Sequence, residues 1–247
     1  MAQGFVPEEL YPWPEMKRLY LLLENEGRAQ HLLRQYYSRK LVDEKIIKHW
    51  AYANTLKFCY FIKQGILFFD EAQRSSVMIK PLLLFYGMTN LKKGLILLHD
   101  PHYPQSSAVL QHGLTTRKKK KASYRFLEDE VKVQREGLIP YFAQTVLGQR
   151  LTIHQKYKIS ALLNPSSDQD RNPSSLHEWL ATHMILYCLS MLCRYDTQSW
   201  MEVMDPSASD ERFVIETFLS KVSLRYPSSV LNFLLPSLSP LNTILGD

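Results

Sequence analysis

The sequence predicts a mainly α-helical bundle, and three observations support this prediction. Apolar residues recur three and four positions apart in several long stretches, which is the spacing of one helix face. Strand-like alternation is confined to a few residues, so we expect at most a short strand pair near 124–135. The chain has 247 residues, 45% of them hydrophobic, which is enough for a sizeable core. We expect a single helical domain over 1–247.

The first half of the chain contains four expected helices behind an extended arm, residues 1–14, that is rich in proline and aromatic residues. The helices have apolar faces, and their ends are marked by Gly27 after the first, Asp43 as the cap of the third and Pro81 in the first turn of the fourth. Gly87 and Gly94 lie inside the fourth helix, where glycine is energetically unfavourable. Their presence predicts that another helix approaches closely at these positions. The expected helices span 15–25, 28–37, 43–69 and 80–98.

The second half alternates between loops and helices. Residues 99–123 are loop-like because proline, glycine and hydroxyl residues are frequent there, and residues 164–174 form a polar linker. Thr152 with Gln155, and Ser175 with Glu178, have the capping-box spacing that predicts a helix start. We expect helices at 138–147, 152–163, 176–195 and from Ser209 to a stop at Pro227, then a short apolar helix and a loose tail at 236–247.

Charge and cysteine content limit the classes of function. Thirty Lys and Arg against 24 Asp and Glu give a net charge of +6, a mild excess that alone says little about an anionic partner. Cys59, Cys188 and Cys193 form no CxxC pair, so we expect buried free thiols in a reducing cytoplasm. The sequence shows no signal peptide and no apolar run of membrane-spanning length, so no membrane partner is expected.

The sharpest charge feature is a basic run made of Arg117, Lys118, Lys119, Lys120 and Lys121. Like charges this close repel one another, so an anion would stabilise them. His112-Gly113 comes just before the run, and glycine lets backbone N–H groups approach a phosphate. One interpretation is a loop that contacts nucleotide or RNA phosphates. The other is a solvated basic loop paired with the acidic residues 128–130. No P-loop or Rossmann glycine pattern is present.

Two further patterns contain histidines. His99-Asp100-Pro101-His102 offers two imidazoles and a carboxylate, but the proline prevents a regular helical histidine pair, so we expect no metal. Arg171 and His177 have a spacing that resembles the arginine–histidine motif of HEPN-type ribonucleases. In those enzymes the two residues act on the RNA phosphate and its 2′-hydroxyl. The other interpretation is a loop arginine and a histidine in a first helical turn.

A polar stripe lies on one face of the most apolar helix and consists of His183, Tyr187, Ser190 and Arg194. Burying such a stripe without partners would be costly. The stripe therefore either meets polar groups of a neighbouring helix or lines a pocket. His183 and Arg194 are also the second candidate pair for a ribonuclease.

Two blocks of the sequence resemble the bacterial YaaC family. The first contains IKPLLLFYGM, a continuation to Leu98, then DPHYP, HGLTTRKKKK and FLEDEVKVQREGL. The second is HMILYCLSMLCRYDTQSWMEV, residues 183–203, and both blocks occur in the family's order. Typical members have a much longer middle segment where this chain has only 151–175. The resemblance therefore gives no support to Arg171 and His177.

The resemblance implies a HEPN-like helical bundle, a class that often dimerises. In some bacteria the gene lies beside that of IMP dehydrogenase, which suggests purine nucleotides. We therefore expect a non-catalytic regulator, without a cofactor, that binds a purine nucleotide through the basic run, with Lys80, Tyr86 and Lys93 contributing from the neighbouring helix. A purine-metabolism enzyme is a candidate partner and a homodimer a candidate assembly. The alternatives are a metal-independent ribonuclease in defence or RNA decay, and a protein-interaction module.

Overall fold

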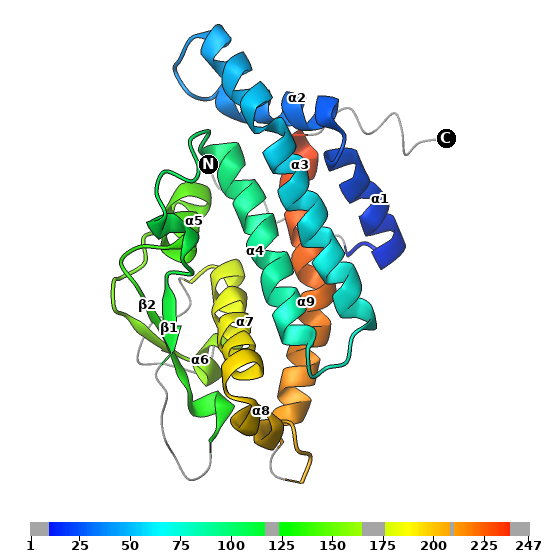
Figure 1. Cartoon of the computed structure of the whole chain (residues 1–247), viewed down its shortest axis with the longest axis vertical. Helices are drawn as coiled ribbons and strands as arrows, with labels where there is room; N and C mark the ends of the chain where they lie inside the picture. The colour runs from blue at the N-terminus through cyan, green and yellow to red at the C-terminus, as the bar shows by residue number, and fades with distance from the viewer. Residues whose placement is uncertain (1–9, 117–123, 165–175, 208–209, 238–247) are drawn as a thin grey trace.

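The computed structural model describes residues 10–116, 124–164, 176–207 and 210–237, and helices dominate these residues (Figure 1). This confirms the predicted mainly α-helical bundle. The longer helices are α1 (Trp13–Leu23), α2 (Glu26–Tyr37), α3 (Glu44–Arg74), α4 (Lys80–His99), α5 (Leu138–Leu147), α7 (Glu178–Tyr195) and α9 (Glu211–Leu234). Shorter helical pieces are α6 (Ile159–Leu163), α8 (Thr197–Val203), η1 (Ala108–Leu110), η2 (Phe126–Glu128) and η4 (Leu235–Ser237).

Helix α4 runs through the middle of the bundle, between α3 on one side and α5 and α7 on the other (Figure 1). The two glycines inside it lie against α3, as their positions predict. A Cβ atom on Gly87 would lie 2.7 Å from the ring of Phe69, and one on Gly65 of α3 would lie 2.8 Å from Leu91. The two backbones therefore approach as closely as glycine permits, which places α4 in the core rather than at the surface.

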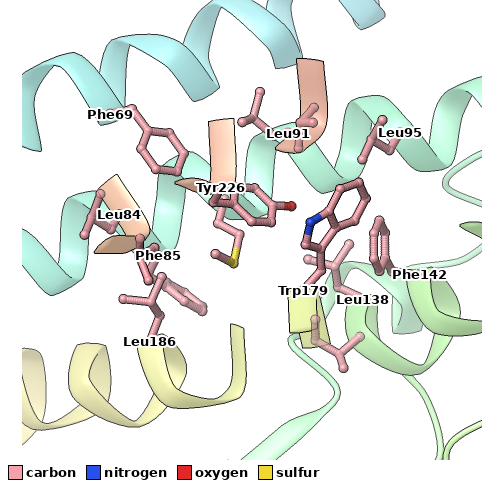
Figure 2. Close-up of a cluster of buried hydrophobic side chains, with 14 of the residues drawn as sticks. Phe69, Leu84, Phe85, Leu91, Leu95, Leu138, Phe142, Trp179, Leu186 and Tyr226 are labelled. Atoms are coloured by element: carbon pink, nitrogen blue, oxygen red, sulfur yellow. The ribbon is translucent and has the colours of Figure 1, made fainter. Parts of the chain in front are cut away.

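Five helices contribute to the central cluster of the hydrophobic core (Figure 2). Aromatic rings from α3, α4, α5, α7 and α9 meet around Tyr226, and leucines of α4, α5 and α7 fill the space between them. The labelled side chains are Phe69, Leu84, Phe85, Leu91, Leu95, Leu138, Phe142, Trp179, Leu186 and Tyr226. Because the cluster draws on residues from 69 to 226, the described helices share one hydrophobic core.

Helix α9 continues through Pro227, so the predicted stop at this proline is wrong. Proline has no backbone N–H, and the carbonyl of Ser223, four residues earlier, loses its helical donor. The side chain of Gln73 on α3 supplies a replacement, since its Nε2 donates to that carbonyl at 3.1 Å. The hydroxyl of Tyr20 on α1 donates to the carbonyl of Pro227 at 2.8 Å. The contact from α3 thus replaces the missing N–H, and the contact from α1 holds the helix at the proline.

A small antiparallel sheet packs beside α7. Its strands are β1 (Leu114–Thr116), β2 (Glu130–Val133) and β3 (Lys156–Lys158), in the order β1-β2-β3. β2 falls in the region where a short strand was expected. β3 replaces the first part of the helix predicted for 152–163, so that prediction is wrong except for α6.

The pairing of β3 explains this error. Val131 and Val133 of β2 are fully buried, and Tyr157 lies opposite Val131 in the ladder. Backbone hydrogen bonds also join Val133 to Gln155 and to His154 on either side. These long-range partners satisfy the backbone of the segment as a strand, which outweighs the local capping signal of Thr152.

Most other boundaries agree with the sequence within a few residues. Helix α3 extends to Arg74, and α1 begins at Trp13, inside the expected arm. Helix α7 begins at Glu178, because His177 caps it by accepting a hydrogen bond from the Trp179 N–H at 3.1 Å. The predicted cap Ser175, the linker from 165 onward and most of the tail lie outside the described residues. Helix α8 was not predicted.

Candidate functional site

The polar stripe of α7 faces α4 and the sheet. Tyr187 donates from its hydroxyl to the carbonyl of Leu114 on β1 at 3.0 Å. Ser190 donates to the carbonyl of Tyr187 at 2.8 Å. Arg194 donates from Nε to the Ser190 carbonyl and from Nη1 to the hydroxyl of Tyr86 on α4, at 3.1 and 3.0 Å. Three members of the stripe are therefore held by internal hydrogen bonds.

His183 is the exception in the stripe. It is completely buried, and neither ring nitrogen has a hydrogen-bond partner among the described residues. Its ring lies 5.1 Å from that of Phe85, measured between centroids. Burial lowers the pKa of His183 well below its ordinary value, and the nearby Lys92 and His112 lower it further. The imidazole is therefore neutral at physiological pH.

His112 packs onto the same face from the loop before β1. Its ring centroid lies 5.1 Å from that of Phe85 and 5.6 Å from that of Tyr187. Burial lowers the pKa of His112, and the positive charges of Arg194 and Lys93 lower it further. The structure thus gathers His112, Arg194 and Lys93 on one side of α4, although they are far apart in the sequence.

Gly113 has a structural reason to be glycine. Its φ is 75°, and a Cβ atom there would lie 2.5 Å from Cδ of Pro140. The backbone of Gly113 packs directly against the backbone of Gly137, whose φ is 133°. The carbonyls of His112 and Gly113 accept hydrogen bonds from Ile139 and Gln134. Tight packing against the start of α5 therefore accounts for this glycine without a ligand.

The basic run Arg117–Lys121 lies outside the described residues, but the chain on either side of it is held firmly. Thr116 ends β1 and pairs with Val131 of β2. On the far side, the carboxylate of Glu211 at the start of α9 accepts hydrogen bonds from the N–H groups of Phe126 and Leu127, both at 3.0 Å. Arg125 forms an ion pair with the same carboxylate at 3.6 Å.

Asp129 and Glu130, which follow the run, have partners among the described residues. Asp129 accepts a hydrogen bond from the Tyr124 hydroxyl at 2.6 Å and one from the N–H of Glu130. Glu130 forms an ion pair with Lys156 of β3 at 3.5 Å. These contacts organise the sheet and the turn beside it.

The predicted contributors on α4 have contacts of their own. Tyr86 stacks on Phe68 of α3, with centroids 5.7 Å apart, while its hydroxyl accepts from Arg194. Lys93 is half-buried, its amine lies 5.8 Å from the ring of Phe61, and burial lowers its pKa. Lys80 is the first residue of α4 and is partly exposed. Tyr86 and Lys93 are therefore fixed in place beside the stripe.

The two ribonuclease pairs do not assemble within the described chain. Arg171 lies outside the described residues, and His177 is the exposed cap of α7. His183 and Arg194 are 194 − 183 = 11 residues apart on one helix. At 1.5 Å per residue their backbones are separated by about 16 Å. His183 is also fully buried, so these two side chains do not converge on one phosphate.

Lys92 is a buried cation that the sequence did not predict, since a lysine usually marks the wet side of a helix. It is completely buried, and its amine donates to the carbonyl of Trp179 at 3.1 Å and to the hydroxyl of Tyr226 at 3.0 Å. The amine also lies 4.5 Å from the ring centre of Phe142. Burial lowers the pKa of Lys92 well below its ordinary value. The signal available was helical spacing, since Met88, Leu95 and Ile96 lie three and four residues from Lys92 and are apolar.

A cavity lies on the other side of α7, between α6, α7 and α9. It has a volume of about 640 Å³ and is lined mainly by apolar side chains such as Leu163, Ile185 and Phe218, with Lys221 and Arg225 of α9 among its polar residues. Of the predicted site residues that the structure describes, none lines it. The cavity and the polar stripe therefore occupy different faces of the same helix.

Among the described residues, no three His, Cys, Asp or Glu side chains come together as a metal site. His99 instead bonds the carbonyl of Leu95 through Nδ1 at 3.0 Å, and Asp100 accepts hydrogen bonds from the His102 backbone, Gln105 and Tyr141. In the same part of the chain, no helix has both the length and the apolar character needed to cross a bilayer.

The fold defines a class of protein: a mainly helical bundle with a small antiparallel sheet packed beside α7. A family model described as YaaC-like Protein matches residues 21–168 and 163–234. The chain therefore belongs to the YaaC-like protein family. Comparison with curated proteins gave no match, and comparison with solved structures gave none either.

Proposed function

We propose that this chain is a non-catalytic regulatory protein of the cytoplasm that binds a phosphate-bearing ligand, most simply a purine nucleotide. The proposed site is the cationic face where α4, α7 and the start of β1 meet. It consists of His112, Lys93 and Arg194, together with the basic run Arg117–Lys121.

The observation that carries the proposal is that two cationic side chains from separate helices, Lys93 of α4 and Arg194 of α7, both lie close enough to His112 to lower its pKa. Because its pKa is lowered, His112 itself adds no positive charge to this face at physiological pH. The basic run begins directly after Thr116. Two residues before Thr116, the carbonyl of Leu114 accepts a hydrogen bond from Tyr187 of the stripe. Adding an anion to such a cluster relieves repulsion, and a phosphate has the charge and the acceptor oxygens to do so.

Two observations favour binding over catalysis. His183 is fully buried and neutral, so it is not placed to exchange protons with a substrate in solution. Arg194 donates hydrogen bonds to Ser190 and Tyr86, so its guanidinium is held in place, which suits a fixed positive charge better than a group that moves during a reaction.

The proposed cytoplasmic location is supported by the cysteines. Cys59, Cys188 and Cys193 are all free thiols, which agrees with a reducing compartment.

The finer parts of the resemblance belong to this proposal. A HEPN-like relationship is supported by the mainly helical bundle. A shortened middle segment is supported by the way the two matched stretches meet at residues 163–168. A purine-metabolism enzyme is the proposed partner, with the bound nucleotide controlling the association.

The test is nucleotide and RNA binding measured by calorimetry over a range of ionic strength. Replacement of Lys118, Lys119 and Lys120 by alanine should weaken binding at least about tenfold at low salt and flatten its salt dependence, because fewer counterions are released. The matched control replaces Arg18, Lys40 and Lys48, three exposed cations on other parts of the bundle, and should leave affinity unchanged. Equal affinity of the two triple variants would refute the proposal.

The same preparations separate the alternatives. Cleavage of RNA by the wild-type protein that disappears in His183→Ala or His177→Ala would replace the proposal with a ribonuclease. Association with a partner enzyme that is indifferent to nucleotide and to the lysine replacements would replace it with an interaction module.

A further inference from the structure

Helix α3 exposes a row of large apolar side chains on its outer face. Ile46 is 42% exposed, Leu56 47%, Tyr60 63% and Leu67 48%. The opposite face of α3 is buried against α1, α2 and α4, so the fold does not need this second apolar face. A surface helix normally presents polar residues there.

The spacing of the row is that of a helix-pairing seam. Ile46, Ala53, Tyr60 and Leu67 are seven residues apart, and Leu56 follows Ala53 by three. A seven-residue apolar repeat is a pattern by which two helices pack side by side, and the second position of this repeat, three residues later, is apolar at Leu56 and polar at His49 and Lys63. The seam from residue 46 to residue 67 is about 31 Å long at 1.5 Å per residue. We call these five residues the α3 stripe.

We propose that the α3 stripe binds the α3 stripe of a second copy of this chain, with the two helices antiparallel. A two-fold interface requires that a surface be complementary to itself. With an axis between residues 56 and 57, Ile46 faces the partner's Leu67, and Ala53 faces the partner's Tyr60. Leu56 lies beside the partner's Leu56 at the axis. The small alanine opposite the large tyrosine lets the two seams interlock.

Charge supports the antiparallel direction. Lys45, beside the first residue of the stripe, is exposed and takes part in no ion pair within the described chain. Glu71, one turn beyond the last residue of the stripe, pairs with Arg74 at 2.7 Å and remains 61% exposed in its side chain. An antiparallel pair sets each Lys45 near the partner's Glu71, whereas a parallel pair sets lysine beside lysine.

A lysine within the seam does not oppose pairing. Lys63, which occupies one of the seam positions, is 60% exposed in its side chain and lies 4.0 Å from Glu24 at the end of α1. The charge is thus directed towards α1 and away from the partner helix. The α3 stripe shares no residue with the proposed ligand site, whose described members lie on α4, α7 and the loop before β1.

The first experiment is sedimentation equilibrium of the full chain over the micromolar range. The wild type is expected to have twice the mass of one chain, and Tyr60→Glu is expected to weaken self-association at least about tenfold, since a buried aromatic anchor is replaced by a charge. Phe213→Glu is the matched control, because Phe213 is a 74% exposed aromatic residue on α9. It should dimerise like the wild type. Circular dichroism checks that both variants are folded.

The second experiment tests the direction by disulfide trapping, with the wild type as a blank. A chain carrying both Ile46→Cys and Leu67→Cys should crosslink to dimers under mild oxidation, while either single variant should not. Crosslinking of the single variants would mean a parallel pair and would overturn the antiparallel arrangement. A monomeric wild type, or a Tyr60→Glu variant that dimerises normally, would overturn the interface itself.

Discussion

His112 and His183 each lie 5.1 Å from the ring of Phe85, one arriving from the loop before β1 and the other from α7. His183 is completely buried and His112 partly, and burial lowers the pKa of each. The two residues link the proposed ligand face to the core. They also make the stability of the fold dependent on pH.

The free energy of unfolding should fall as the pH drops below about 6.5, the ordinary histidine value in an unfolded chain. The folded pKa values of His112, His183 and His99 are all lowered, so the unfolded chain takes up protons first and is favoured by acid. The stabilising contribution is fully present above that pH. Urea titrations at a series of pH values give the dependence.

His183→Leu should flatten the acid side of this profile, because it removes the most deeply buried of these groups. His31→Leu is the control, since His31 is exposed on α2 and bonds only to Gln35. An unchanged profile in His183→Leu would contradict the prediction.

Lys92→Met tests the buried amine. The folded pKa of Lys92 lies well below its ordinary value, so the wild type loses stability as the pH falls from about 10.4 towards the folded pKa, while the methionine variant does not. The stability of the variant relative to the wild type should therefore rise between alkaline and neutral pH. Lys93→Met, at the half-buried neighbour, should show a smaller change of the same sign.

Gly87→Ala should destabilise the protein by about 1–3 kcal/mol, the usual cost of overfilling a packed core. Its new methyl group would meet the Phe69 ring at 2.7 Å and the Gly65 carbonyl at 3.1 Å. The gain in helix propensity, about 1 kcal/mol, does not offset this clash. Gly27→Ala is the comparison, because a Cβ atom there meets only Asn25 at 3.4 Å. Thermal unfolding of the two variants should move in opposite directions.

Gln73 and Pro227 should be energetically coupled. Gln73→Leu removes the donor to the Ser223 carbonyl and should cost about 0.5–1.5 kcal/mol, the net worth of one hydrogen bond. In a Pro227→Ala background the alanine N–H can serve that carbonyl, so the same replacement should cost almost nothing. A double-mutant cycle measured by urea unfolding gives the coupling, and strict additivity would rule it out.

Local signals predicted the helices well because capping, proline placement and apolar spacing act within a few residues. Asp43 caps α3 by accepting from the Lys45 N–H, and Gly148 ends α5 in a left-handed conformation with φ 64°. The errors came from distant partners. Gln73 lies 150 positions from the carbonyl that it rescues, and β3 exists because β2 offers it an edge.

The candidate site was predicted only in part, because some of its contacts follow from local spacing and others depend on distant segments. The stripe of His183 and Arg194 follows from helix periodicity, and the structure adds that His112 packs onto it. Lys92 was missed because its burial depends on α5, α7 and α9 closing around α4. These helices are far apart in the sequence, so no short stretch of it indicates that Lys92 is buried.

The contact between Gly65 and Gly87 has a mechanical consequence. Packed side chains absorb small displacements by changing rotamer, but two glycines have no side chains to adjust, and a Cβ atom on either would lie within 3.2 Å of the other's carbonyl oxygen. Helices α3 and α4 are therefore expected to move as one rigid body at this point. Displacement of α4 by an anion at its cationic face would carry α3 and its outer surface with it, so the two faces are joined by a stiff coupling.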